Sequence, residues 1–368
     1  MTEQMYVLQT LLIAGALFGL CWRESVLLRV QTLIWSIGVI VLGARFGLTE
    51  QLNFYSNDQG HYVSIVQQLS NFEISSELNW WLQRSKLPFT LPASLLALLG
   101  VNETLALKTV SLGCLLLLSR MLLKHRLTRS VGTSARVIYL TACGGIGIFY
   151  SILALRETMM MLVLTKFVLT KSPVTRILLF GILMLLRPHL AASVLIAVFL
   201  ISFWDNLRQN RRETPLSMFG LGTAGVAVGS VLYAVGIWLE GSNFELTGSR
   251  WGVSSITRVA SNYVGLQFLT ARSETVEFSI QALLVLRVAL SETIVIPTLF
   301  SLCLLIRPEF ATTRSRLTLV AFSVYLGLVT NTDFNSFRQN IPFMAMMGLV
   351  ILHHSRRHRS REYAETSS

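Results

Sequence analysis

Charged residues are scarce in this chain: Asp, Glu, Lys and Arg make up 14% of its 368 residues, where soluble domains carry about a quarter. This scarcity argues against a soluble globular protein. Hydrophobic residues reach 52%, and they form runs of about 15 to 25 residues separated by short polar clusters. The composition therefore predicts an all-α polytopic integral membrane protein.

Several chemical signatures are also missing. The sequence has no glycine-rich nucleotide-binding loop, no zinc-ligand spacing and no nucleophile elbow. The first basic residue, Arg23, follows the first apolar run, which argues against a cleaved signal peptide and places the N-terminus outside. The cysteines show no metal-ligand spacing and are expected to be buried free thiols: Cys21, Cys114, Cys143 and Cys303.

About eleven transmembrane helices are expected. They lie at about 5–21, 30–45, 105–119, 137–155, 158–170, 174–186, 190–204, 217–239, 280–306, 316–332 and 341–352. The fifth and sixth are short for a bilayer, as in broken or re-entrant helices that line a cavity. Residues 1–368 are predicted to form a single transmembrane domain, with large outer loops at 46–104 and 240–279.

The formal net charge of +12 has a one-sided distribution. Basic residues gather in the loops after alternate spans, and by the positive-inside rule that side faces the cytoplasm. The opposite side is close to neutral. We therefore predict a multi-pass protein of the cell inner (plasma) membrane with a cytoplasmic C-terminus. The basic tail 353–368 is expected to contact anionic lipid, and no nucleic-acid partner is expected.

The first outer loop contains an unusually polar stretch, Tyr55-Ser-Asn-Asp-Gln-Gly-His61-Tyr62. Apolar residues at spacings of 3 and 4 in the segment 60–72 then predict an amphipathic helix on the membrane surface. Pro88 and Pro92 bracket a short apolar stretch that is predicted to re-enter the membrane.

Asp58 is the candidate general base or cation ligand of this loop, with His61 and Tyr62 beside it. A carboxylate near the N-terminus of the amphipathic helix is kept ionised by the helix dipole. The alternative is that Asn57 or Asp58 serves only as the helix N-cap.

Three arginines are placed at outer membrane ends by the same topology: Arg156, Arg187 and Arg338. The guanidinium group suits a bidentate grip on phosphate, so three of them around an Asp suit a phosphate or pyrophosphate lipid. Glu157, His189 and Gln339 accompany the three arginines in the sequence. The alternative is that each arginine only snorkels to outer lipid headgroups.

The order of these features resembles the GT-C superfamily of polyprenyl-phosphate-sugar-dependent glycosyltransferases, such as protein O-mannosyltransferases. The resemblance covers about residues 46–205. It rests on Asn57-Asp58-Gln59-Gly-His61-Tyr62, Leu91-Pro-Ala-Ser-Leu-Leu-Ala-Leu-Leu-Gly-Val-Asn-Glu103, Tyr150-Ser-Ile-Leu-Ala-Leu-Arg156-Glu157 and Gly181-Ile-Leu-Met-Leu-Leu-Arg187-Pro188. It implies a GT-C-like fold in which Asp58 is catalytic base or metal ligand. Gln59 departs from the usual Asp-Glu pair, and a soluble C-terminal extension is absent from this sequence.

Two other functions fit part of the pattern. The compact size, the Arg156-Glu157 turn and the Arg338-Gln339 pair also resemble exopolysaccharide and O-antigen polymerases, which join lipid-linked repeat units on the same face. A transporter or flippase for an anionic lipid or solute would also use intramembrane charges and short central spans. The notable polar residues concentrate on the outer side, which favours an enzyme with one-sided access.

The expected reaction is hexosyl or pentosyl transfer from a polyprenyl-(pyro)phosphate carrier to a hydroxyl of a glycan, lipid or protein. Asp58, aided by His61, would take the acceptor proton, while Glu157 orients an arginine or is itself the base. The expected substrate-binding residues are Tyr62, Arg156, Arg187, His189, Arg338 and Gln339. One carboxylate holds a metal weakly, so no cofactor is expected to be obligatory, and a divalent cation remains the alternative.

Overall fold

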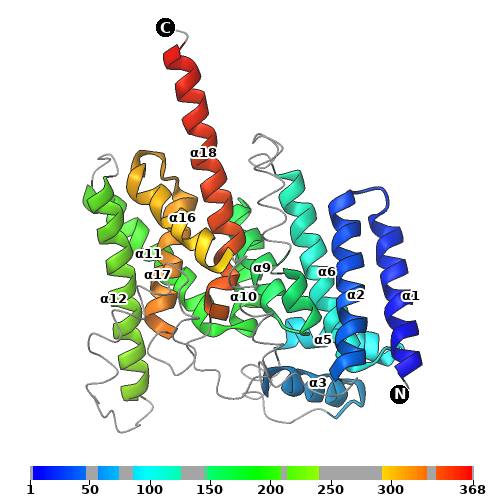
Figure 1. The fold of residues 1–368 in the computed structure, drawn as a ribbon. Coiled ribbons are helices and arrows are strands. Elements are labelled where there is room, and N and C mark those ends of the chain that lie inside the picture. Colours follow the sequence, from blue (N-terminus) through cyan, green and yellow to red (C-terminus); the bar gives the residue numbers. More distant parts are fainter. Residues whose placement is uncertain are drawn as a thin grey trace. The chain divides into compact units, whose positions relative to one another are not determined.

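The structure is a computed structural model that describes residues 3–46, 57–73, 86–125, 145, 147–208, 214–239, 292–329 and 337–366. Every regular element in this part of the chain is a helix, which confirms the predicted all-α class there (Figure 1). The longer helices are α1 (Glu3–Cys21), α2 (Val26–Phe46), α3 (Asn57–Ser70), α5 (Leu87–Leu98), α6 (Glu103–Lys124), α9 (Glu157–Leu169), α10 (Pro173–Leu186), α11 (Pro188–Arg208), α12 (Pro215–Leu239), α16 (Glu292–Ile306), α17 (Thr313–Val329) and α18 (Met344–Thr366). The predicted loop 240–279 and residues 137–144 and 146 of the predicted span 137–155 lie outside the described residues.

Four of the described helices are long and apolar enough to cross a membrane: Gln4–Cys21, Glu103–Lys124, Pro188–Leu207 and Pro215–Val235. The helices α9 and α10 have 13 and 14 residues. At about 1.5 Å per residue they are shorter than the bilayer core of about 30 Å, as the sequence predicts for this part of the chain. The number of eleven spans and the GT-C-like arrangement stay predictions.

The chain divides into two compact units. Unit 1 comprises Met1–Arg129 and Arg136–Val163, and unit 2 comprises Ser130–Ala135 and Leu164–Ser368. These are clusters of contacts, and they leave the prediction of a single transmembrane domain over residues 1–368 untested.

Polar contacts at the start of α1 show that α1 and α6 run in the same direction in unit 1. The Gln9 side chain donates to the Gly100 carbonyl (2.8 Å) and accepts from the Asn102 N–H (3.1 Å), just before α6 begins. Between the ends lies an apolar core built around Trp35 and Leu112, which are fully buried. The parallel direction agrees with the predicted topology, in which both helices start on the outer side.

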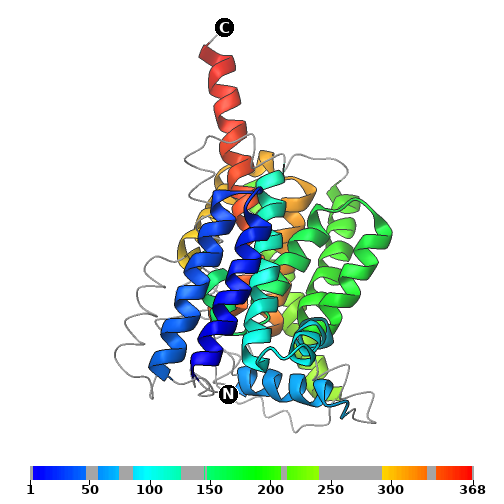
Figure 2. The same cartoon turned by 90° about the vertical axis from the view of Figure 1, so that its right-hand side faces the viewer.

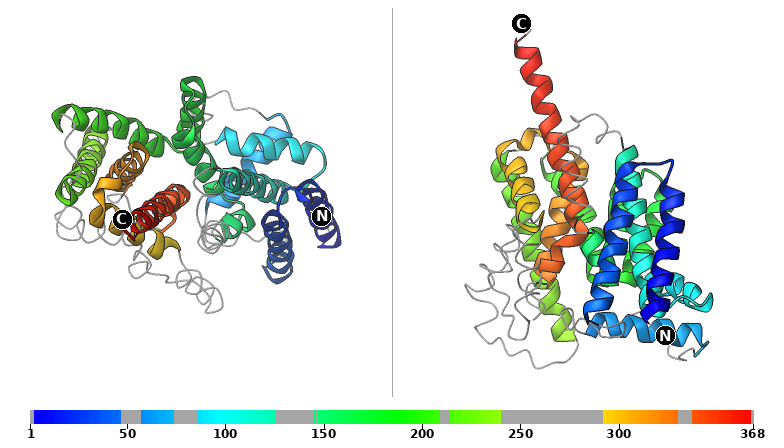
Figure 3. Two further views of the ribbon diagram at one scale, coloured as in Figure 1. Left: turned by 90° about the horizontal axis from the view of Figure 1, so that it is seen from above. Right: turned by 45° about the vertical axis from the view of Figure 1, so that its right-hand side comes forward.

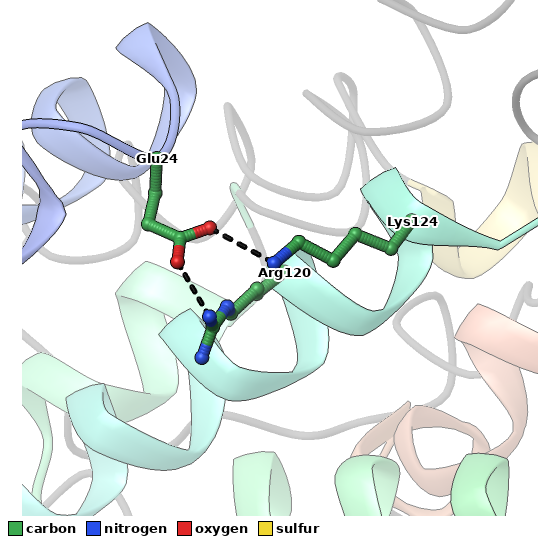
Figure 4. A network of polar contacts seen from close by, with 3 residues as sticks. All are labelled: Glu24, Arg120 and Lys124. Atoms are coloured by element: carbon green, nitrogen blue, oxygen red, sulfur yellow. Dashed lines mark hydrogen bonds and ion pairs between the residues drawn. The ribbon is translucent and has the colours of Figure 1, made fainter.

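At the opposite end of unit 1, Glu24 joins the α1–α2 turn to the last turn of α6 (Figure 4). Its two carboxylate oxygens contact Arg120 (2.5 Å) and Lys124 (3.2 Å). Hydrogen bonding from Lys124, the largest effect, and then from Arg120 outweighs partial desolvation and holds the pKa of the Glu24 carboxyl below its ordinary value. The ion pair therefore couples two loops that the sequence assigns to the cytoplasmic side.

The helix α3 runs roughly perpendicular to α1, α2 and α6, at the end of unit 1 where α1 begins (Figures 2 and 3). Its inner face buries Tyr62, Ile65 and Val66, at the spacing that predicted an amphipathic helix. The helix begins at Asn57, earlier than the expected residue 60, so Asp58 lies in its first turn. The apolar stretch that follows forms the short helix α5, which packs against α3 and α6.

In unit 2, α12 and α17 cross with their backbones in close contact, beside α11 (Figure 3). A Cβ atom at Gly229 would overlap the Val324 carbonyl oxygen, and one at Gly327 would overlap the Val226 carbonyl oxygen. Only a residue without a side chain fits at these two points. At its far end α11 carries Asp205, which pairs with Arg316 at the start of α17.

The last helix, α18, is longer than the predicted span 341–352. It continues without a break to Thr366, and it projects beyond the other helices of its unit (Figures 1 and 2). Residues 355–366 contain neither proline nor glycine, so nothing in the basic tail terminates the helix.

Alanine at Gly229 is expected to lower the free energy of unfolding by about 1–3 kcal/mol, because the added methyl group meets backbone atoms that cannot rotate away. Gly220 is the matched control in the same helix, since a Cβ there meets only the Trp204 ring at 3.6 Å. Gly220→Ala should be neutral or stabilise by up to about 1 kcal/mol. Denaturant unfolding in detergent micelles measures both, and equal effects of the two variants would contradict the close crossing.

The ion pair of Glu24 is expected to make unfolding depend on pH. Because the pKa of Glu24 is lowered in the folded protein, its contribution is complete above the ordinary pKa of a glutamate, about 4.3, and is lost as the pH falls through the folded value. Wild type should therefore lose slightly more stability than Glu24→Gln between about pH 7 and pH 3. Unfolding midpoints of both proteins at the two pH values measure this, and parallel curves would refute it.

Candidate functional site

Unit 1 brings together two residues that the sequence predicted to bind substrate. The guanidinium carbon of Arg156 lies 5.8 Å from the centroid of the Tyr62 ring. The Phe89 ring of α5 also packs edge-on against Tyr62, with 5.5 Å between the two ring centroids. A guanidinium group over an aromatic ring gains about 0.5–2 kcal/mol, depending on how dry the contact is. Segments far apart in the chain thus converge at this tyrosine.

A tight turn before α9 determines where Arg156 lies. The N–H of Leu155 bonds the Tyr150 carbonyl (3.1 Å) and the N–H of Ala154 bonds the Ser151 carbonyl (3.2 Å), the two bonds of a Schellman helix end. Ala154 has φ 56°, the left-handed conformation in which glycine is usual. One helix therefore ends at this turn and α9 begins immediately after Arg156.

A hydroxyl group of α6 holds this turn in place. The Ser111 O–H donates to the Leu155 carbonyl at 2.8 Å, and its oxygen lies 2.7 Å from the Thr158 hydroxyl. Because the single proton of Ser111 is used by Leu155, Thr158 is the donor in the second bond. Both bonds are buried, so α6 holds the backbone of Leu155 and the side chain of Thr158, on either side of Arg156 and Glu157.

The acidic residues of the predicted site lie on the same two segments. Glu157 is the first residue of α9 and its side chain is fully buried. Asp58 lies in the first turn of α3, where the structure describes the backbone but not the side chain. His61 is exposed on α3, one residue before the buried Tyr62. The predicted acid–base residues of the first outer loop and of the Arg-Glu turn therefore belong to one unit.

In unit 2 a second arginine lies at another helix break. Arg187 ends α10 in an extended conformation, and Pro188 begins α11. Its guanidinium carbon lies 5.5 Å from the centroid of the Tyr325 ring on α17. His189 follows as an exposed residue in the first turn of α11. Pro188 prevents α10 from continuing past Arg187, so the local sequence determines the break.

The segment with the third predicted arginine lies beside the same tyrosine. The 3₁₀ helix η4 (Phe337–Phe343) contains Arg338 and Gln339, whose backbone is described and whose side chains are not. The Phe343 ring at its end lies 5.6 Å from the Tyr325 ring. Tyr325 thus touches both Arg187 and η4, and the predicted residues of this half share one neighbourhood.

Lys108 is a buried cation that was not among the residues expected from the sequence. It lies inside the apolar helix α6, and its ammonium group donates to the Tyr6 hydroxyl at 3.2 Å. Tyr6 is its one hydrogen-bond partner among the described residues. The signal that marks it is a lysine within an apolar span, since charged residues there are expensive and often functional.

The two helix starts differ in charge. The helix α9 begins with the buried carboxylate of Glu157, whereas α11 has no acidic residue in its first turn. The positive N-terminal dipole of α9 is therefore already opposed by an acid, while that of α11 adds to Arg187. In the described part of the chain no three His, Cys, Asp or Glu residues are grouped to hold a metal ion, and the metal requirement stays a prediction.

No family model matches the chain, and comparisons with curated proteins and with solved structures find no match.

Alanine at Ser111 is expected to destabilise the protein by about 1–3 kcal/mol, because it leaves the Leu155 carbonyl and the Thr158 hydroxyl buried without their partner. Ser94 is a matched control, since its hydroxyl donates to the Leu91 carbonyl within its own helix. Ser94→Ala should cost less than about 1 kcal/mol. Denaturant unfolding in micelles tests the difference, and an equal loss in both variants would show that Ser111 does not clamp the turn.

Proposed function

We propose that this chain is a membrane glycosyltransferase that moves a hexosyl or pentosyl group from a polyprenyl-(pyro)phosphate carrier to an acceptor hydroxyl on the extracytoplasmic face. The observation that carries the proposal is the contact between Arg156 and Tyr62 next to the buried Glu157. The two sequence segments that contain these residues each have polar residues at the predicted outer membrane face. Tyr62 also lies on the helix whose first turn holds Asp58.

Unit 1 supplies the acid–base chemistry in this proposal. Asp58 or Glu157 accepts the proton of the acceptor hydroxyl, and the exposed His61 assists it. The guanidinium group of Arg156 lies over the Tyr62 ring, which restricts its orientation. Its N–H groups form a planar fork of hydrogen-bond donors. A positioned general base contributes roughly 10²- to 10⁴-fold to the rate.

Arg187 lies in a setting that suits a phosphate ligand. Arg187 lies between two helices, just before Pro188, with its guanidinium over the Tyr325 ring, and the first turn of α11 adds a positive dipole without an acidic residue in that turn. Arg338 and Gln339 are assigned to the same ligand because η4 also contacts Tyr325 through Phe343. His189 is an exposed member of the same turn.

The reaction then follows from these parts. The acceptor oxygen attacks the anomeric carbon, and its proton passes to the carboxylate. The bond between the anomeric carbon and the phosphate oxygen breaks, and the phosphate leaves with the electron pair. The arginines stabilise the charge that develops on this oxygen, a contribution of about 10²- to 10³-fold for a single donor. No obligatory metal is required, because the guanidinium groups supply the positive charge.

The test is a transfer assay with the full chain reconstituted in lipid vesicles and supplied with polyprenyl-phosphate- and polyprenyl-pyrophosphate-linked sugars. Asp58→Asn, Arg187→Ala and Arg338→Ala are each expected to lower kcat/KM by about 10²-fold or more. Arg176→Ala is the control, since Arg176 is an exposed arginine of α10 that bonds the Thr170 carbonyl.

If wild type is active and all three site variants are equally active, the proposed site is wrong. Absence of transfer from every donor would contradict the enzyme and favour a transporter of an anionic lipid. The length of the product separates single transfer from polymerisation: a polymerase gives a ladder of repeat units, whereas a transferase adds one sugar.

A further inference from the structure

The helix α3 has an outward face of uncharged hydrogen-bonding side chains. Ser64, Gln67 and Asn71 are exposed, and their spacing of 3 and 4 places them on one side of the helix, opposite Tyr62 and Val66. None of the three side chains bonds to another residue in the described part of the chain. We call Ser64, Gln67, Asn71 and the following Phe72 the polar ridge.

The composition of α3 argues against a contact with lipid headgroups. Helices that lie on membranes usually carry Lys or Arg on their polar face, to meet anionic lipid. The chain has 31 Lys and Arg, yet residues 57–70 contain none, and Asp58 is their single charged residue. A neutral face of amides and hydroxyls matches a ligand rich in neutral hydroxyl groups.

Phe72 differs from the rest of the polar ridge in its backbone conformation and in its exposed aromatic side chain. It has φ 58° and follows the end of α3, in the position of a Schellman motif where glycine is usual. The two bonds of the motif are Phe72 N–H to the Leu69 carbonyl (3.3 Å) and Glu73 N–H to the Gln68 carbonyl (2.8 Å). Phe72 is 74% exposed. The left-handed conformation strains the backbone of Phe72, and its exposed side chain gains no free energy from burial. This combination points to a ligand that covers the ring.

We propose that the polar ridge binds the sugar rings of a neutral glycan. The amide and hydroxyl groups of Ser64, Gln67 and Asn71 exchange hydrogen bonds with sugar hydroxyls, and the apolar face of one sugar ring packs on Phe72. The ridge shares α3 with Asp58 and Tyr62, about 20 Å from end to end, so a bound chain leads to the first turn of the helix. This inference rests on the proposed function, and it identifies the acceptor as a glycan rather than a protein or a lipid.

The experiment measures binding of the full chain in nanodiscs to an array of neutral gluco-, manno-, galacto- and rhamno-oligosaccharides. Wild type is expected to bind at least one class. Phe72→Leu should weaken that binding about 5- to 10-fold, whereas Phe72→Tyr should retain it, because tyrosine keeps an aromatic face and leucine does not. The double variant Gln67→Ala with Asn71→Ala should weaken binding at least as much.

Phe219→Leu is the matched control, since Phe219 is 62% exposed on α12. It is expected to bind like wild type. Equal binding by Phe72→Leu and wild type would overturn the proposal, because an aromatic residue that only enters the bilayer can be replaced by any apolar one. Failure of wild type to bind every oligosaccharide on the array would also overturn it.

The same variants separate this inference from the proposed function. If Asp58→Asn abolishes sugar transfer while Phe72→Leu leaves the KM for the acceptor unchanged, the enzyme stands and the polar ridge is not its acceptor site. If glycans bind to the ridge but no donor supports transfer, the ridge stands as a binding site and the transferase is wrong.

Discussion

The hydrogen bond from the Ser111 hydroxyl to the Leu155 carbonyl is the interaction on which the candidate site of unit 1 depends. A helix end in the apolar interior exposes carbonyl groups that water cannot reach, and each needs a partner. Ser111 supplies one and also accepts from Thr158, so both sides of the break are tied to α6. The break in turn places Arg156 over Tyr62 and puts Glu157 at the first position of α9.

Both units use the same device to hold an arginine. Each arginine lies where one helix ends and another begins, and each guanidinium lies over a tyrosine of a neighbouring helix, Tyr62 for Arg156 and Tyr325 for Arg187. At each break the carbonyl of the arginine accepts the first bond of the next helix, from the Met160 N–H for Arg156 (3.0 Å) and from the Ala191 N–H for Arg187 (3.2 Å), and the ring restricts the guanidinium group. The N–H donors of a guanidinium group lie in its plane, and such a planar fork suits a carboxylate or phosphate.

Local patterns in the sequence predicted those parts of the fold that local physics determines. The spacing of apolar residues gave the amphipathic α3, and the length of two apolar runs gave the short helices α9 and α10. The Ser111–Leu155 bond and the Lys108–Tyr6 bond join residues far apart in sequence, and hydropathy carries no information on such pairs. The left-handed Phe72 could not be predicted either, because glycine is the residue that signals that conformation.

The starts of α9 and α11 differ in charge, and this difference assigns them different roles in the proposed reaction. The first turn of α9 carries Glu157, whereas the first turn of α11 contains no acidic residue, so the positive end of the α11 dipole suits a phosphate better. In the proposed transferase the start of α11 therefore suits the carrier phosphate, whereas the start of α9 suits a proton acceptor, because of the two only α9 has a carboxyl group in its first turn.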